Sequence, residues 1–127
     1  MSNNPHSRSV LVVDDELLIR WALTEALAAN GYRVSEARDG AEARAALTVD
    51  GGPDVVLLDF RLPDSADLRL LADIRRRLPA VPVLLMSAHA TPDVVRGALD
   101  LGAYRVVTKP FDVREVVALV GEALAAR

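Results

Sequence analysis

The sequence VLVVDD, residues 10–15, is an apolar run that ends on two carboxylates, and comparable runs recur along the chain. The run VVLLD ends on Asp59, VLLMS ends on Ser87, and the shorter VVTK ends on Lys109. In an open parallel sheet the ligand crevice lies beyond the carboxyl ends of the strands. If the four runs are neighbouring strands, three carboxylates, one hydroxyl and one ammonium meet at one edge of the sheet.

The bulk composition restricts the class of protein. The chain has 127 residues, of which 51% are hydrophobic and 26% charged, and it contains no cysteine. This composition fits one globular domain and excludes disulfides, cysteine-based metal sites and a thiol nucleophile. The net charge of −3 and the lack of a Lys/Arg-rich face argue against direct nucleic-acid binding. No apolar stretch approaches the roughly 18 residues that span a bilayer. Residues 1–8 are polar, so we expect a flexible lead before a cytoplasmic domain.

Short apolar strands and amphipathic helices alternate five times along the chain. Strands are predicted near residues 9–13, 32–37, 55–58, 83–86 and 104–107. Helices are predicted near residues 16–30 and 66–78, after a capping box at Asp39 and Glu42, between Thr91 and Gly102, and from Val113 to Leu124. Trp21 lies off the inward stripe of the first helix, and we expect it to be partly buried.

The strand patterns predict the order of the sheet. The first, third and fourth strands are almost continuously apolar, so helices should cover both of their faces. The second and fifth strands alternate and belong at the edges, with Tyr104 and Val106 on one face of the fifth. Right-handed crossovers then favour the order 2-1-3-4-5. The predicted fold class is α/β, a single domain with a doubly wound five-stranded parallel sheet.

Asp14, Asp15 and Asp59 should lie within a few ångströms of one another at the strand ends. Ionised carboxylates this close repel each other, and a bound cation relieves the repulsion. An all-oxygen site with open positions suits Mg²⁺. The alternative for the first two aspartates is that they only cap the first helix.

A carboxylate can also act as a nucleophile and carry a phosphoryl group. Asp59 ends the central strand and is the best-placed candidate. Lys109 and Ser87 can offset charge on a transferred group and bond its oxygens. Each also has a simpler interpretation, Ser87 as a strand-end hydroxyl and Lys109 as an exposed edge lysine. Lys109 precedes Pro110, and a cis peptide bond there can aim the lysine inward.

Four segments together resemble the receiver domain of two-component response regulators: VLVVDDE (10–16), LLDFRLP (57–63), MSA (86–88) and TKPF (108–111). The resemblance covers residues 9–126, in family order and at family spacing. The sequence of residues 102–111 is especially similar to that of receivers attached to sigma-54-type transcriptional activators. The resemblance implies a bacterial protein with a flavodoxin-like fold, with residues 9–127 as the receiver domain.

The resemblance also implies a role for each strand-end residue. Asp59 would accept a phosphoryl group from a phosphohistidine of a sensor histidine kinase. Ser87 would then move toward the phosphoryl group and Lys109 would pair with it. The Mg²⁺ ligands would be Asp14, Asp15, Asp59 and the backbone carbonyl of Arg61.

Two positions depart from the family pattern. The family commonly has a switch aromatic three residues before the lysine, where this chain has Val106. Tyr104 lies two residues earlier, and its reach toward the site differs. The family also often has glycine eight residues after the acceptor, where this chain has Asp67, so the loop here need not follow the common path.

The leading hypothesis is therefore a signalling domain rather than an enzyme that turns over a metabolite. Phosphorylation would bias the surface made by the fourth helix, the fifth strand and the fifth helix, which is also the expected homodimer surface. One alternative is a degenerate receiver that serves only as an interaction module. Another is an aspartyl-phosphate hydrolase, which usually has an Asp where this chain has Glu16. A dinucleotide-binding fold is disfavoured because no G-x-G-x-x-G follows the first strand.

Overall fold

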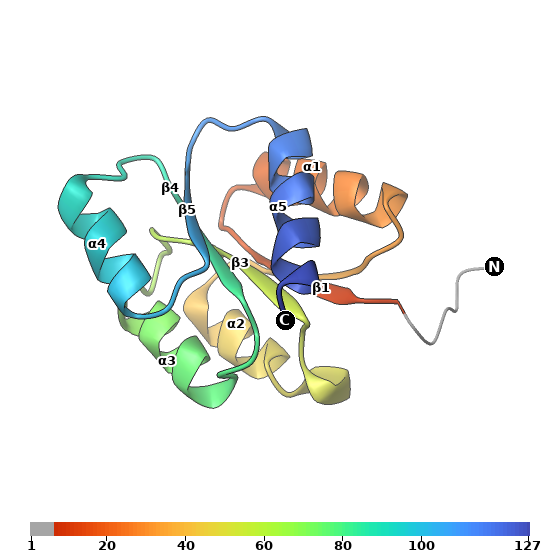
Figure 1. Ribbon diagram of the computed structural model, residues 1–127, viewed down its shortest axis with the longest axis horizontal. Coiled ribbons are helices and arrows are strands. Elements are labelled where there is room, and N and C mark those ends of the chain that lie inside the picture. The colour runs from red at the N-terminus through yellow and green to blue at the C-terminus, as the bar shows by residue number, and fades with distance from the viewer. Residues whose placement is uncertain (1–6) are drawn as a thin grey trace.

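The computed structural model describes residues 7–127 and contains a parallel sheet in the order β2-β1-β3-β4-β5 (Figure 1). The strands are β1 (Ser9–Val13), β2 (Arg33–Ala37), β3 (Val55–Asp59), β4 (Val83–Ser87) and β5 (Arg105–Thr108). The helices are α1 (Leu17–Ala29), α2 (Gly40–Ala46), α3 (Arg69–Arg77), α4 (Pro92–Asp100) and α5 (Val113–Ala125), and a short 3₁₀ turn, η1, spans Val49–Gly51. The predicted order and alternation are confirmed. The predicted lead falls mainly on residues 1–6, which lie outside the described residues.

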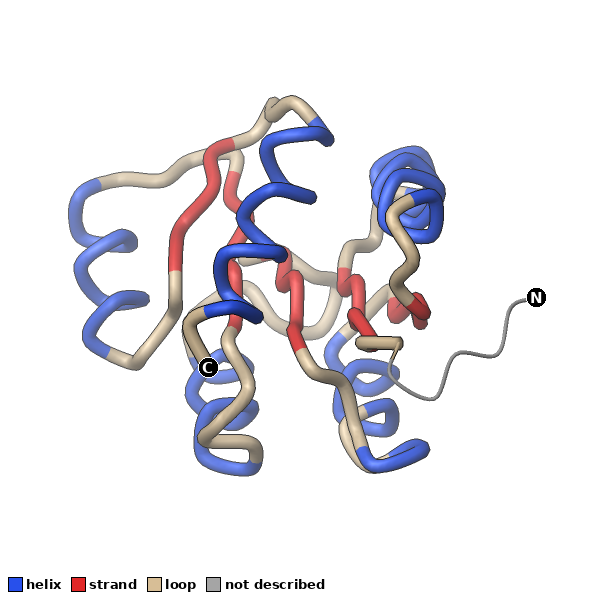
Figure 2. The backbone as a smooth tube through the Cα atoms, turned by 45° about the vertical axis from the view of Figure 1, so that its right-hand side comes forward, coloured by secondary structure: helices blue, strands red, loops and turns tan. Residues whose placement is uncertain are grey.

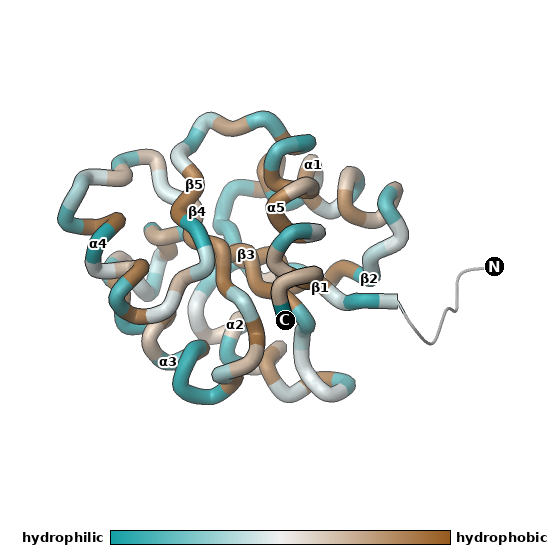
Figure 3. Tube along the Cα trace, viewed as in Figure 1, coloured by the Kyte–Doolittle hydropathy of each residue, from teal (hydrophilic) through white to brown (hydrophobic). Residues whose placement is uncertain are grey.

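Helices cover both faces of the sheet, as the apolar strands predicted (Figure 2). On one face, α1 and α5 pack against side chains such as Leu57 and Met86. On the other, α2, α3 and α4 pack against side chains such as Leu11 and Leu85. The central strands carry the most continuous hydrophobic colour (Figure 3). Two-sided burial therefore fixes β1, β3 and β4 in the middle of the fold.

The edge strands β2 and β5 are partly exposed, as their alternation predicted. The prediction that Tyr104 and Val106 share a face of the fifth strand is wrong. Val106 packs with the cluster under α3 and α4, whereas Tyr104 packs with the cluster under α1 and α5. The reason is that β5 begins only at Arg105, so the two-residue alternation does not extend back to Tyr104.

Local capping explains where two helices begin. Asp39 accepts a hydrogen bond from the Glu42 amide at 2.8 Å, and the Glu42 side chain accepts one from the Arg38 amide at 2.9 Å. Thr91 accepts a hydrogen bond from the Val94 amide at 3.3 Å, with proline in the first turn of α4. Both predicted starts are confirmed. By contrast, α3 begins at Arg69, later than predicted, because the loop before it forms its own turn.

The exposed face of α1 is unusually apolar. Leu17, Leu18 and Trp21 are 66%, 78% and 60% exposed. The prediction that Trp21 is partly buried is therefore wrong, because its position turns it away from the inward stripe formed by Leu23 and Leu27. Within residues 7–127, no helix has the length and apolar character needed to cross a membrane.

Glycine is required where η1 leads into β3. Gly52 has φ 82° and ψ 172°, and a Cβ there would lie 2.5 Å from the Leu47 carbonyl oxygen. Gly31, after α1, has φ 90° but no atom within 4 Å of such a Cβ. Gly52→Ala should lower the free energy of unfolding by about 3 kcal/mol, and Gly31→Ala by about 1 kcal/mol. Urea unfolding of the two variants measures the difference, and equal losses would contradict the close approach at Gly52.

Candidate functional site

The carboxyl ends of β1, β3, β4 and β5 surround a cavity of about 330 Å³. Its lining includes the predicted strand-end residues Asp15, Asp59, Ser87 and Lys109, together with Arg61. The sequence therefore predicted correctly which side chains the sheet brings together. The chemical roles assigned to them remain predictions that geometry alone does not test.

Four carboxylates form a cluster at this edge of the sheet. Ligand atoms of Asp14, Asp15, Glu16 and Asp59 all lie within 4.8 Å of one another. Asp14 is fully buried and Asp59 is 5% exposed, whereas Asp15 and Glu16 are exposed. Glu16 was not among the predicted ligands, although its place directly after the aspartate pair was a signal for it.

Lys109 supplies the one ammonium that contacts this cluster among the described residues. Its Nζ lies 2.8 Å from Asp14 Oδ2, 3.2 Å from Asp59 Oδ2 and 3.2 Å from Glu16 Oε1. The side chain is only 10% exposed, so the simpler interpretation as an exposed edge lysine is wrong. The Lys109–Pro110 bond, considered above as a candidate cis bond, is cis.

Burial and mutual charge perturb the two central groups of the site. Desolvation, reinforced by the neighbouring Asp14 charge, raises the pKa of Asp59 from 3.8 to about 6, although Lys109 opposes this shift. Desolvation disfavours the Lys109 ammonium, but hydrogen bonds and attraction to Asp14 and Asp59 outweigh it and raise the lysine pKa. The lysine therefore remains charged near neutral pH. Asp59, with a pKa of about 6, changes its protonation state just below neutral pH.

Every polar atom of Asp14 takes part in a hydrogen bond. Its Oδ1 accepts a hydrogen bond from the Glu16 amide at 2.9 Å, and its own amide donates to the Ala37 carbonyl at 3.0 Å. Arg20 donates to the Asp14 carbonyl at 2.8 Å and contacts Glu36 at 3.2 Å. The sequence analysis did not predict the role of Arg20. Its position was a signal, because a charged residue three positions before the buried Leu23 lies beside the inward face of α1.

Two further groups line the cavity, one just after β3 and one at the end of β4. The Arg61 amide donates to Asp59 Oδ1 at 3.3 Å, which orients this carboxylate. The Ser87 side chain accepts a hydrogen bond from the His89 amide at 3.2 Å. Ser87 is 2% exposed, and its carbonyl accepts a hydrogen bond from the Lys109 amide at 2.8 Å. Strand pairing between β4 and β5 thus sets the spacing between the hydroxyl and the ammonium.

The donor set of the cluster fits a hard divalent cation. All of its candidate side-chain ligands are carboxylate oxygens, which Mg²⁺ prefers to nitrogen or sulfur donors. Four ionised carboxylates against one lysine would leave three negative charges uncompensated. Asp15 forms no side-chain hydrogen bond or ion pair with the described residues and is free to bind a cation.

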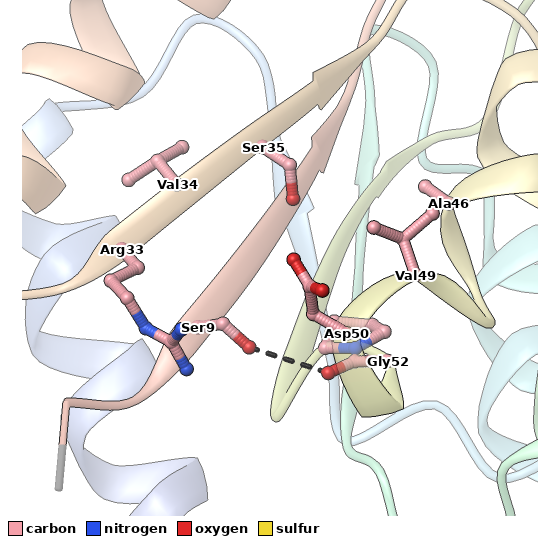
Figure 4. A pocket seen from close by; sticks show the side chains of 9 residues that line it. Ser9, Arg33, Val34, Ser35, Ala46, Val49, Asp50 and Gly52 are labelled. Atoms are coloured by element: carbon pink, nitrogen blue, oxygen red, sulfur yellow. Dashed lines mark hydrogen bonds between the residues drawn. The ribbon is translucent and has the colours of Figure 1, made fainter. Parts of the chain in front are cut away.

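Another cavity of about 330 Å³ lies at the opposite end of the sheet (Figure 4). Ser9, Arg33, Ser35 and Asp50 contribute polar groups to its lining, and the Ser9 hydroxyl lies 3.4 Å from the Gly52 carbonyl oxygen. This cavity borders the amino ends of β1 and β2, outside the crevice where α/β sheets bind ligands. The acidic cluster is therefore the better candidate site.

Comparisons with known proteins show which proteins the chain is similar to. A family model described as the response regulator receiver domain matches residues 10–121. The chain is 43% identical over 116 residues to the DNA-binding transcriptional regulator NtrC of Escherichia coli K12, covering 91% of this chain and 24% of that protein. It is also 43% identical over 110 residues to the probable transcriptional regulatory protein TcrX of Mycobacterium tuberculosis, covering 86% of this chain and 46% of that protein. The chain thus spans about a quarter of the NtrC relative.

Solved structures show the same fold. The receiver domain of NtrX from Brucella abortus superposes with a TM-score of 0.84 at 32% identity, covering 93% of this chain and 99% of that one. A CheY-like receiver domain protein from Methanospirillum hungatei has a TM-score of 0.89 at 24% identity, covering 94% and 95%. The second match supports the fold alone.

The raised pKa of Asp59 predicts a pH-dependent cost in stability. Between its unfolded value of 3.8 and its folded value of about 6, the folded state binds more protons than the unfolded state, so stability falls as pH rises through this window. In metal-free buffer, Asp59→Asn should therefore be more stable than wild type at pH 7.5, by about 1 to 3 kcal/mol. Urea unfolding should show this gain shrinking toward pH 4. A variant less stable than wild type at pH 7.5 would contradict the prediction.

Proposed function

This chain belongs to the response regulator receiver domain family, and we propose that it accepts a phosphoryl group on Asp59 from a phosphohistidine of a sensor histidine kinase. The observation that carries the proposal is the contact of Lys109 with both Asp14 and Asp59 beside a cluster of oxygen ligands. A nucleophile, a charge-balancing ammonium and a cation site are the parts that phosphoryl transfer requires.

The chemical step follows from the positions of these groups. An Asp59 carboxylate oxygen attacks phosphorus while the bond from phosphorus to the histidine nitrogen breaks, and the electron pair of that bond stays on the imidazole. Asp59 must be ionised to attack, so the ammonium of Lys109, 3.2 Å away, favours the reactive form. The lysine then pairs with the transferred group, and the Ser87 hydroxyl donates to one of its oxygens.

A metal ion completes this arrangement. Asp14, Asp15, Asp59 and the Arg61 backbone carbonyl would hold Mg²⁺, since the three carboxylates lie in one cluster. Bound Mg²⁺ would neutralise charge on the phosphoryl oxygens in the transition state.

The kinase should dock on α1. Leu17, Leu18 and Trp21 are exposed there, and an adjacent cavity of about 420 Å³ is lined largely by apolar side chains. That cavity shares Glu16 and Lys109 with the acidic site, so a protein seated on α1 reaches the acceptor. An exposed apolar patch of this kind marks a protein interaction site.

We propose that the signal leaves the site through the loop between β4 and α4. The Ser87 hydroxyl is bonded to the His89 amide, the His89 carbonyl to the Thr91 amide, and the Thr91 hydroxyl to the Val94 amide in α4. A shift of Ser87 toward a phosphoryl group would therefore move the start of α4 without a swinging aromatic side chain. Val106 packs beneath α4 and can follow this movement.

The surface made by α4, β5 and α5 is the proposed output face and homodimer contact. Leu99 and Leu101 are 48% and 40% exposed near the end of α4, and Arg105 pairs with Glu122 across β5 and α5. These apolar and charged groups lie on the elements that the loop after Ser87 would displace.

Phosphorylation chemistry tests the acceptor. With Mg²⁺ and a small phosphodonor such as acetyl phosphate, wild type should gain one phosphoryl group by intact mass spectrometry, and Asp59→Ala should gain none. Asp93→Asn is the control, because its side chain is 95% exposed on α4. Phosphorylation that survives Asp59→Ala would refute the acceptor assignment. An unmodified wild type would favour the interaction module, and multiple turnovers of a phosphate ester would favour the hydrolase.

Kinase docking has its own test. Trp21→Ala should slow phosphotransfer from a histidine kinase that phosphorylates wild type by about tenfold or more, while modification by acetyl phosphate is unchanged. Val49→Ala is a matched control, since Val49 is as exposed as Trp21, at 60%, but lies in η1. Equal effects of the two substitutions on phosphotransfer would contradict docking on α1.

A further inference from the structure

We propose that Asp64 is a positioning residue for the acidic site, which it serves by tying the loop between β3 and α3 to the start of α2. In this way it fixes the backbone of Arg61, whose carbonyl is a proposed metal ligand. This inference rests on the proposed function and assigns a role to a residue outside the acidic cluster.

Two hydrogen bonds join Asp64 to α2. Its Oδ1 accepts from the Gly40 amide at 2.7 Å, and its Oδ2 accepts from the Ala41 amide at 3.0 Å. The Gly40 amide has the largest effect in lowering the pKa of Asp64, and the Ala41 amide adds to it. Bonds of this kind, from amides to an ionised carboxylate, are among the stronger hydrogen bonds in proteins.

The local caps of α2 leave these two amides for Asp64. Asp39 takes the Glu42 amide, and the Glu42 carboxylate takes the Arg38 amide. The first amides of a helix have no partner within it, so Gly40 and Ala41 need an acceptor from elsewhere. Asp64, 24 residues after Gly40, is that acceptor.

Gly40 permits the close approach. A Cβ at this position would lie 3.0 Å from Asp64 Oδ1 and 3.4 Å from both Asp64 Cγ and Arg44 Nη1. An alanine would therefore require the carboxylate to move by a few tenths of an ångström, away from the amides that it accepts from. The close contact between α2 and the loop thus depends on both residues, on the missing side chain of Gly40 and on the carboxylate of Asp64.

A backbone turn connects the anchored Asp64 to Arg61. Leu62 and Ser65 hydrogen-bond each other through both backbones, at 2.8 and 3.2 Å, and the Leu62 side chain is buried. Asp64 lies inside this tight turn, and Arg61 lies immediately before it. On the other side of Arg61, the Phe60 amide donates to the Met86 carbonyl at 2.8 Å. Arg61 is therefore held between two fixed points, one of which depends on Asp64.

Asp67 offers a matched comparison within the same loop. Its side chain accepts a hydrogen bond from the Arg69 amide at 2.9 Å, at the start of α3. Both aspartates are exposed and end in a carboxylate, but only Asp64 ties the loop to α2. Replacing each in turn separates the loss of the anchor from the loss of one negative charge near the site.

The test measures Mg²⁺ affinity by isothermal titration calorimetry, at a temperature where circular dichroism shows every variant folded. Asp64→Ala should raise the Mg²⁺ dissociation constant about tenfold, which is the usual loss when a group that orients a metal ligand is removed. Asp67→Ala should raise it less than about twofold. Asp64→Asn, which keeps one acceptor oxygen, should fall between wild type and Asp64→Ala.

Gly40→Ala tests the same contact from the other partner. Alone it should weaken Mg²⁺ binding, because its Cβ displaces the carboxylate. Combined with Asp64→Ala it should add no further loss, because the contact is already absent. Additive losses, or equal effects of Asp64→Ala and Asp67→Ala, would overturn the proposal. Wild type that binds no Mg²⁺, or whose Mg²⁺ binding survives Asp59→Ala, would instead refute the proposed function.

Discussion

The ion pair of Lys109 with two buried carboxylates is the interaction on which this site depends. Nζ lies 2.8 Å from Asp14 Oδ2 and 3.2 Å from Asp59 Oδ2. Without that ammonium, two aspartates that are at most 5% exposed would face each other with no compensating charge. One lysine does not balance four neighbouring acids, and burial, reinforced by the charge of Asp14, raises the pKa of Asp59 to about 6 despite that lysine. A site left with excess negative charge is unfavourable by itself, and a bound cation would relieve the repulsion.

Burial of apolar side chains in the sheet offsets the cost of the buried charges at the strand ends and also fixes their geometry. Leu57 and Leu58, directly before Asp59, are 0% and 2% exposed, and burial of each such side chain stabilises the fold by about 1.5 to 3 kcal/mol. That gain is comparable to the electrostatic cost at the strand end. Because every residue of β3 is buried and helices cover both faces of the sheet, a one-residue shift of register would move Asp59 into the core position of Leu58 or Asp54 into that of Val55. Asp59 is therefore held in place by the apolar run that precedes it.

The sequence was informative wherever a short-range pattern decides the outcome. Apolar runs predicted the central strands, turn chemistry predicted the starts of α2 and α4, and the strand ends predicted the residues around the cavity. Predictions failed where position depends on tertiary packing. Tyr104 breaks the alternation because β5 begins after it, and Trp21 is exposed although its residue type favours burial. Asp64 was not predicted because its partners lie 23 and 24 residues away, and no local spacing indicates such a contact.

The loops that follow β3 and β4, on either side of Asp59, are held by different numbers of contacts. This difference indicates which of them a change at Asp59 would move. The loop after β3 has a buried leucine, a reciprocal backbone turn and an anchor on α2. The loop after β4 has no buried residue between Ala88 and Thr91 and is held by a short series of hydrogen bonds beginning at Ser87. A change of charge at Asp59 would act on both, and the second is held by fewer contacts to the rest of the fold. If Asp59 is phosphorylated as proposed, movement should therefore pass to α4, while the loop that carries the proposed metal ligand Arg61 stays in place.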